Sequence, residues 1–156
     1  MDYLARKIKR ARWEVNANLG QQAIAADALT RCLQTEGNAL SVWECDDTDN
    51  DVREVVLALV TPMDHLETLD VVLVAKDVLN AIDIAFQQTP GRTKALDLVN
   101  RRNDLMNLDI DAVHRLAVHI AGGVRQSERV YRFTRSRVRE IVMNAIRGLS
   151  LIHISE

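Results

Sequence analysis

Residues 69–74, with the sequence LDVVLV, restrict the folds open to this chain more than any other segment. Five of the six side chains are apolar and three of these are valine, which is typical of a strand in the middle of a sheet. Residues 40–45 (LSVWEC) also favour extended structure, because valine and tryptophan are enriched in strands. Residues 84–88 (IAFQQ) are a further candidate strand, which the Thr-Pro-Gly turn at 89–91 would end.

The N-terminal segment 3–13 (YLARKIKRARW) has two interpretations. Leu4 and Ile8 recur at helical spacing, yet apolar residues interspersed with Arg and Lys also suit an edge strand guarded by charge. We favour the strand, because a cluster of turn-forming residues follows at 16–20.

Hydrophobic periodicity predicts five helices, at residues 24–33, 51–60, 76–82, 110–121 and 134–147. Thr48, Asp109 and Thr134 are the expected N-caps, and Gly122-Gly123 and Gly148 are expected to end the last two helices. We therefore predict an α+β fold, with a small mixed sheet of three to four strands and four to five helices, two of them C-terminal.

Length and composition fit one globular domain over residues 1–148. The chain has 156 residues, of which 47% are apolar and 27% charged, close to the average for folded proteins. No apolar run is long enough to cross a membrane, and no apolar segment of a signal peptide follows the basic N-terminus. Cys32 and Cys45 lack the spacing of a metal or redox motif, so we expect two free thiols in a cytoplasmic protein.

The last eight residues, LSLIHISE at 149–156, are expected to be foreign to the fold. They resemble, in every position, the translation of a transposase adapter that is used in sequencing libraries. The resemblance implies that the gene sequence ran into adapter near Gly148. The alternative is a genuine strand, because Leu151, Ile152 and Ile154 suit one.

Catalytic signatures are absent from the sequence, which contains no phosphate-binding loop, dinucleotide fingerprint, zinc motif or nucleophile elbow. Asp111 and His114 are the only weak catalytic candidates, because a carboxylate three residues before a histidine on one helix can orient the imidazole. His114 should flank the apolar stripe of its helix, and His119 should lie toward the polar side. We predict no cofactor and no metal, and whether the chain is an enzyme stays open.

Four aspartates within residues 46–51 form an acidic cluster. Carboxylates at this density can hold Mg²⁺ or Ca²⁺, but the segment lacks the central glycine and the closing glutamate of a calcium loop. We favour a solvated turn that precedes a helix.

Charge is segregated along the chain behind a net charge of −2. Residues 2–14 and 125–147 are rich in Lys and Arg, whereas residues 44–83 carry eleven acidic side chains. Arg135 and Arg137 fall in the first turn of the last helix, where the macrodipole disfavours cations. Together with Arg139 they are the predicted interaction residues, and we expect them to contact carboxylates of residues 44–83 or of a partner.

A non-enzymatic protein-interaction or regulatory module is the function that this pattern favours, with another protein as partner and without membrane contact. One alternative is a small enzyme that uses Asp111 and His114. The other is a nucleic-acid-binding domain that uses the C-terminal arginines, with four aromatic residues of the basic segments stacking on bases: Tyr3, Trp13, Tyr131 and Phe133. The pI of about 6.1 makes nucleic acid the less favoured partner.

The adapter resemblance predicts that removing residues 149–156 changes stability little. A chain ending at Gly148 should unfold within about 1 kcal/mol of the full chain, since a packed element is worth more than that. Urea denaturation of the two chains measures the difference, and a larger loss on truncation would show that the segment belongs to the fold.

Overall fold

The computed structural model describes residues 1–90 and 96–154, which fold around one six-stranded sheet. The strands are β1 (Tyr3–Ile8), β2 (Leu40–Cys45), β3 (Leu69–Ala75), β4 (Phe86–Gln88), β5 (Arg102–Leu105) and β6 (Val130–Phe133). The α-helices are α1 (Asp49–Val60), α2 (Lys76–Ala81), α3 (Ile110–Arg125) and α4 (Arg135–Ile154). The short helical turns are η1 (Arg10–Arg12), η2 (Ala28–Cys32) and η3 (Leu96–Arg101).

The strand order is β4-β5-β2-β1-β3-β6, and every neighbouring pair is antiparallel. The α+β class is therefore right, but the predicted mixed sheet of three to four strands is wrong. The two strands that were missed are β5 (RNDL) and β6 (VYRF), each of four residues. β5 is mostly polar and has little propensity for extended structure, whereas β6 contains strand-forming residues but has only four positions. Pairing with β2 and β3 therefore decides the conformation of both.

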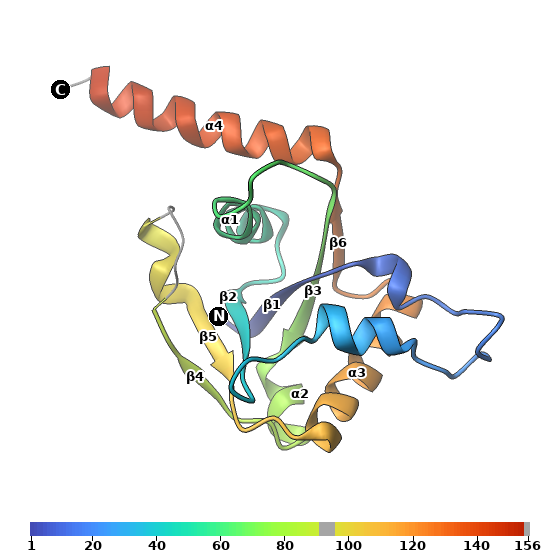
Figure 1. The fold of residues 1–156 in the computed structure, drawn as a ribbon. Helices are drawn as coiled ribbons and strands as arrows, with labels where there is room; N and C mark the ends of the chain where they lie inside the picture. Colours follow the sequence, from blue (N-terminus) through green and yellow to red (C-terminus); the bar gives the residue numbers. More distant parts are fainter. Residues whose placement is uncertain (91–95, 155–156) are drawn as a thin grey trace.

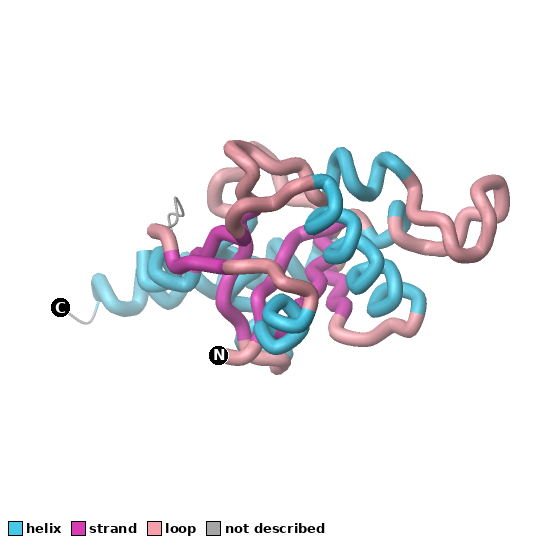
Figure 2. The backbone as a smooth tube through the Cα atoms, turned by 90° about the horizontal axis from the view of Figure 1, so that it is seen from below, coloured by secondary structure: helices cyan, strands magenta, loops and turns pink. Residues whose placement is uncertain are grey.

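Two apolar layers cover the two faces of the sheet (Figures 1 and 2). On one face, α3, α2 and η2 pack against Leu4, Val42 and Val72. On the other face, α1 and the start of α4 pack against Val71 and Leu73. All six residues 69–74 are buried, which confirms the central strand predicted from the LDVVLV run.

Residues Tyr3–Ile8 of the N-terminal segment form a strand, as we favoured, whereas Arg10–Arg12 form the helical turn η1. The strand is not at an edge. β1 pairs with β2 on one side and with β3 on the other, from Tyr3 opposite Ala75 to Ile8 opposite Asp70. Its charged residues are tolerated there because the Arg6 guanidinium donates hydrogen bonds to backbone carbonyls instead of to water.

The N-caps of α1, α3 and α4 and the end of α1 at Val60 were predicted correctly, whereas the ends of α3 and α4 were not. Thr48, Asp109 and Thr134 each accept a hydrogen bond from a backbone N–H in the first turn of α1, α3 and α4. However, α3 continues through Gly122-Gly123 to Arg125, and α4 continues past Gly148 to Ile154. A Cβ at Gly123 would lie 3.3 Å from the Glu128 carbonyl oxygen, so this glycine serves the close approach of the following turn.

The second half of α4 extends beyond the body of the molecule (Figure 1). The predicted turn at 89–91 and the final residues 155–156 lie partly or wholly outside the described residues. Within the described part of the chain, no helix combines the length and the apolarity needed to span a bilayer.

Cys32 and Cys45 are both buried and free, which confirms the expectation of unlinked thiols. The sheet separates them, because Cys32 belongs to the apolar layer under α3 and Cys45 to the layer under α1. Burial, followed by the charge of nearby Asp51, raises the pKa of the Cys45 thiol to about 12, so this thiol stays protonated at neutral pH.

Candidate functional site

The predicted catalytic pair, Asp111 and His114, lies near the N-terminus of α3 with both side chains exposed. Within the described residues, neither a hydrogen bond nor an ion pair joins the two. Asp111 is in the first turn of the helix, where its charge is favourable to the macrodipole. The pair therefore occupies an open helix surface that offers a substrate no enclosure.

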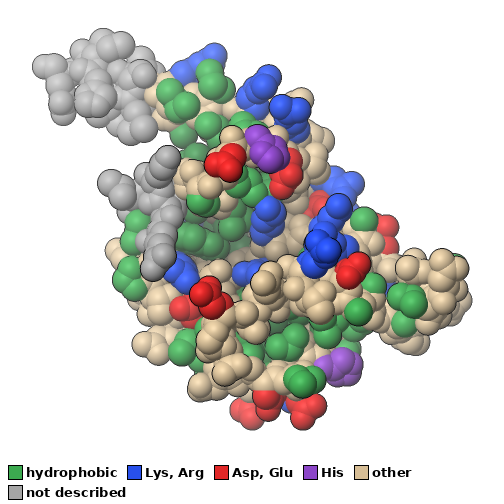
Figure 3. Space-filling model, in the orientation of Figure 1, with side chains coloured by type: hydrophobic (Ala, Val, Ile, Leu, Met, Phe, Trp, Pro, Cys, Tyr) green, Lys and Arg blue, Asp and Glu red, His purple; other side chains and the backbone are tan. Residues whose placement is uncertain are grey.

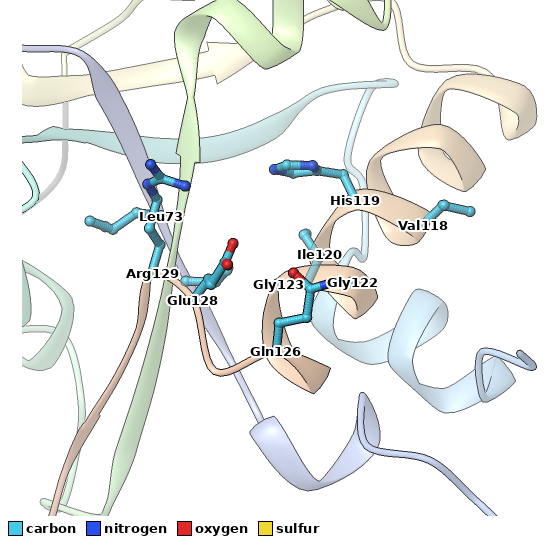
Figure 4. A pocket seen from close by; sticks show the side chains of 10 residues that line it. Leu73, Val118, His119, Ile120, Gly122, Gly123, Gln126, Glu128 and Arg129 are labelled. Atoms are coloured by element: carbon cyan, nitrogen blue, oxygen red, sulfur yellow. The ribbon is translucent and has the colours of Figure 1, made fainter. Parts of the chain in front are cut away.

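His119 is the histidine that lies in a hollow, contrary to the expectation that it would point to the polar side. It is half-buried in a pocket of ≈270 Å³ between α3 and the turn before β6, and Figure 4 shows its ring and the Glu128 carboxylate directed into that space. Burial, followed by the positive charge of Arg129, lowers the pKa of His119, so the imidazole is neutral at physiological pH.

The chemistry of the His119 pocket is limited. Its lining contains no serine, threonine, cysteine, lysine or tyrosine that would serve as a nucleophile. Across the described part of the chain, no three His, Cys, Asp or Glu side chains are arranged to hold a metal ion. A neutral imidazole beside a carboxylate can transfer protons, but the lining of the pocket supplies no nucleophile that the imidazole could activate.

The C-terminal basic segment meets the acidic middle of the chain through a series of ion pairs. Arg129 lies 3.7 Å from an Asp47 carboxylate oxygen, and Arg137 lies 3.8 Å from one of Asp49. The Tyr131 hydroxyl also donates to Asp47. Arginines thus neutralise the acidic cluster at 46–51, which agrees with a turn before a helix and leaves few free carboxylates for a cation.

The three predicted interaction residues are not equivalent. Arg137 bonds Asp49 and stacks its guanidinium 5.3 Å from the centre of the Phe133 ring. Arg135 and Arg139 are exposed beside a shallow hollow, and no ion pair involves either of them in the described part of the structure.

A basic pocket of ≈770 Å³ lies where the end of β1 and η1 face η2, the start of β3 and the end of β6. Figure 3 shows Lys and Arg side chains gathered over the part of the molecule where Figure 1 places η1 and η2. We call this site the basic pocket. Its charged lining residues are Arg6, Lys7, Lys9, Arg12, Arg31, Arg132, Glu67 and Asp70.

Only two of the six cations in the basic pocket have a carboxylate partner. Lys7 lies 3.6 Å from Glu67, and the Arg132 Nε atom lies 2.7 Å from Asp70. The other four, within the described residues, form no ion pair; these are Arg6, Lys9, Arg12 and Arg31. The pocket therefore carries an excess of four positive charges on its lining.

Cys32 holds several of these groups in place. The Arg6 guanidinium donates to the Cys32 carbonyl oxygen from Nε at 3.2 Å and from Nη2 at 3.1 Å, and to the Ser41 carbonyl oxygen from Nη1 at 2.7 Å. The Cys32 sulfur accepts from the Lys9 backbone N–H at 3.4 Å and from the Arg12 guanidinium at 3.8 Å. Residues from two distant segments therefore converge on one point of the pocket wall.

Asp70 is a buried carboxylate at the edge of the same pocket, with 5% of its surface exposed. It accepts two hydrogen bonds from Arg132 and one from the Arg10 backbone N–H at 2.9 Å. Burial raises the pKa of Asp70, but the hydrogen bonds and charges of Arg132 and Arg10 outweigh burial, and the net effect is a lowered pKa.

The sequence showed only part of the basic pocket. The basic run at residues 6–12 was visible, but its convergence with Arg31 was not, because Cys32 lies 26 residues after Arg6 along the chain. The available signal was a strand that carries an arginine between two buried apolar residues, Leu4 and Ile8, which requires hydrogen-bond partners for a guanidinium in the interior.

Replacing Asp70 by Asn should lower the free energy of unfolding by about 1–3 kcal/mol at pH 7, because the buried side chain loses its charge-assisted hydrogen bonds from Arg132 and from the Arg10 backbone N–H. A carboxyl with a lowered pKa stabilises the fold above the unfolded-state pKa of about 4 and loses this effect as the pH falls through the folded-state pKa.

The difference in unfolding free energy between wild type and Asp70→Asn should thus shrink as the pH falls below about 4. Urea denaturation across this range measures it, with Glu67→Gln as the control, because the Glu67 carboxylate is half exposed. A difference that is independent of pH would contradict the role assigned to the Asp70 charge.

Comparisons of the chain with protein-family models, with curated proteins and with solved structures found no match. The function of the chain is therefore inferred from the charge and the geometry of the site.

Proposed function

We propose that this chain is a non-enzymatic interaction module that binds an acidic segment of a partner protein in the basic pocket. The observation that carries this proposal is the group of four cationic side chains, Arg6, Lys9, Arg12 and Arg31, that lack a carboxylate partner in the described structure. Exposed or half-buried cations around a concave surface attract an anionic ligand and steer its approach.

The distribution of ion pairs supports this assignment of the binding surface. The acidic middle of the chain already engages other arginines: Asp51 bonds Arg101 at 3.0 Å, Asp49 bonds Arg137, and Asp70 bonds Arg132. The basic pocket is left with more positive charge than its own carboxylates neutralise. A negatively charged segment of a partner would neutralise this excess positive charge.

Nucleic acid is a poorer candidate for the partner. Of the four aromatic residues that stacking on bases would use, Trp13 and Phe133 are 0% and 1% exposed. The Tyr131 hydroxyl donates to Asp47, and the Tyr3 ring lies under the Arg129 guanidinium at 5.2 Å. The net charge of −2 also differs from the basic footprint that nucleic-acid-binding domains carry.

An enzyme is also less well supported than an interaction module. Asp111 and His114 are exposed on a helix surface, and the pocket that contains His119 has no nucleophile in its lining. Neither place combines the two or three chemical roles that a catalytic site needs.

Binding of a fluorescein-labelled peptide of ten glutamates tests the proposal by fluorescence anisotropy. We expect micromolar affinity that weakens as salt rises from about 50 to 200 mM, because charge attraction provides most of the binding energy. The double variant Arg12→Gln with Arg31→Gln should weaken binding about tenfold, which corresponds to about 1.4 kcal/mol.

The matched control is Arg135→Gln with Arg139→Gln, which removes the same charge from exposed positions outside the basic pocket. We expect it to change the affinity by less than about twofold, as for distant surface charges. An equal loss in both double variants, no binding by the wild type, or tighter binding of a single-stranded RNA of equal charge would contradict the proposed function.

A further inference from the structure

The basic pocket has more structure than a diffuse patch of positive charge. Arg6 is fixed by hydrogen bonds to the carbonyl oxygens of Cys32 and Ser41, and the Arg12 guanidinium rests against the Cys32 sulfur. Arg31 precedes Cys32 directly in the chain and lines the same pocket. Two guanidinium groups are thus bonded to Cys32 and held in place before any ligand arrives, and a third arginine lines the same pocket.

Arg6 in particular forms no ion pair within the described residues. Its partners are two backbone carbonyls and the Ser41 hydroxyl, which accept hydrogen bonds but carry no net charge. Burial is the largest influence on this group and lowers the pKa of Arg6. A charge that is removed from water beside an open pocket favours an anion on its remaining accessible side.

We propose that the bound segment carries a phosphorylated serine or threonine, and that its phosphoryl group binds Arg6, Arg12 and Arg31 beside Cys32. This inference rests on the proposed function and specifies the group that the pocket recognises. A single carboxylate supplies one negative charge and two oxygens. A phosphoryl group supplies about 1.5 to 2 negative charges and three acceptor oxygens, which suits several guanidinium groups at once.

The carboxylates already in the pocket do not satisfy these arginines. Glu67 pairs with Lys7, and Asp70 pairs with Arg132, on the side of the pocket formed by β3 and β6. In the described residues neither carboxylate reaches Arg6, Arg12 or Arg31. The side of the pocket around Cys32 therefore keeps its charge for an external ligand.

Three peptides that differ at one central position test the inference by isothermal titration calorimetry. The flanking sequence contains two glutamates on each side, and the centre is phosphoserine, glutamate or serine. We expect the phosphoserine peptide to bind at least about tenfold tighter than the glutamate peptide and tighter still than the serine peptide, as for forked arginine contacts to phosphate.

Arg12→Lys with Arg31→Lys keeps the charge but removes the forked donors, and avoids the risk that a variant of the buried Arg6 does not fold. In this variant the preference for phosphoserine over glutamate should fall to less than about threefold, while the decaglutamate peptide still binds. Inorganic phosphate should displace the phosphoserine peptide from the wild type at concentrations where acetate does not.

The outcomes separate this inference from the proposed function. Equal affinity for the phosphoserine and glutamate peptides overturns the phosphoryl assignment and leaves the acidic-segment proposal standing. Binding of neither peptide overturns both. A phosphoserine preference that survives in the Arg12→Lys, Arg31→Lys variant would place the phosphoryl group elsewhere and would also overturn the inference.

Discussion

A carboxylate buried within a sheet must be neutralised by groups close to it, and in this protein that requirement links three distant segments. Asp70 lies in β3, the strand covered on both faces, and it accepts hydrogen bonds from Arg132 of β6 and from the backbone N–H of Arg10. The edge strand β6 and the chain that leaves β1 are thereby attached to the centre of the fold. The same attachment positions the wall of the basic pocket, because Asp70 and Arg132 line it together with the end of β1.

Charge is divided between pairs that stabilise the fold and cations left available for a ligand. The acidic segment after β2 bonds Arg101, Arg129 and Arg137, so the segregation of charge along the chain is largely neutralised once the chain folds. The cations around Cys32 are one exception, since their partners in the described structure are carbonyl oxygens and a sulfur atom, and the exposed Arg135 and Arg139 are another. Under the proposed function, the N-terminal cations bind the ligand, whereas Arg129, Arg132 and Arg137 mainly stabilise the fold.

The elements that could be predicted from sequence are those whose conformation is determined by residues close to them in the chain. The valine-rich run of β3 and the N-cap at Thr48 depend on neighbouring residues, and both were identified correctly. β5 and β6 were missed because strands of four residues are too short to give a clear alternating pattern, and pairing with β2 and β3 holds them extended. The site was missed for a similar reason: its contacts join residues 20 to 62 positions apart, and no local pattern reports such contacts.

The most direct test of the central claim compares the arginines themselves. In a two-dimensional NMR spectrum of the arginine Nε–Hε groups, titration with inorganic phosphate should shift the signals of Arg12 and Arg31 and leave those of Arg132 and Arg137 in place. That result follows if Asp70 and Asp49 already pair with Arg132 and Arg137, while Arg12 and Arg31 have no anionic partner in the part of the chain that the structure describes. Equal shifts for all four arginines, or the largest shifts at Arg135 and Arg139, would contradict the assignment of the basic pocket as the binding site.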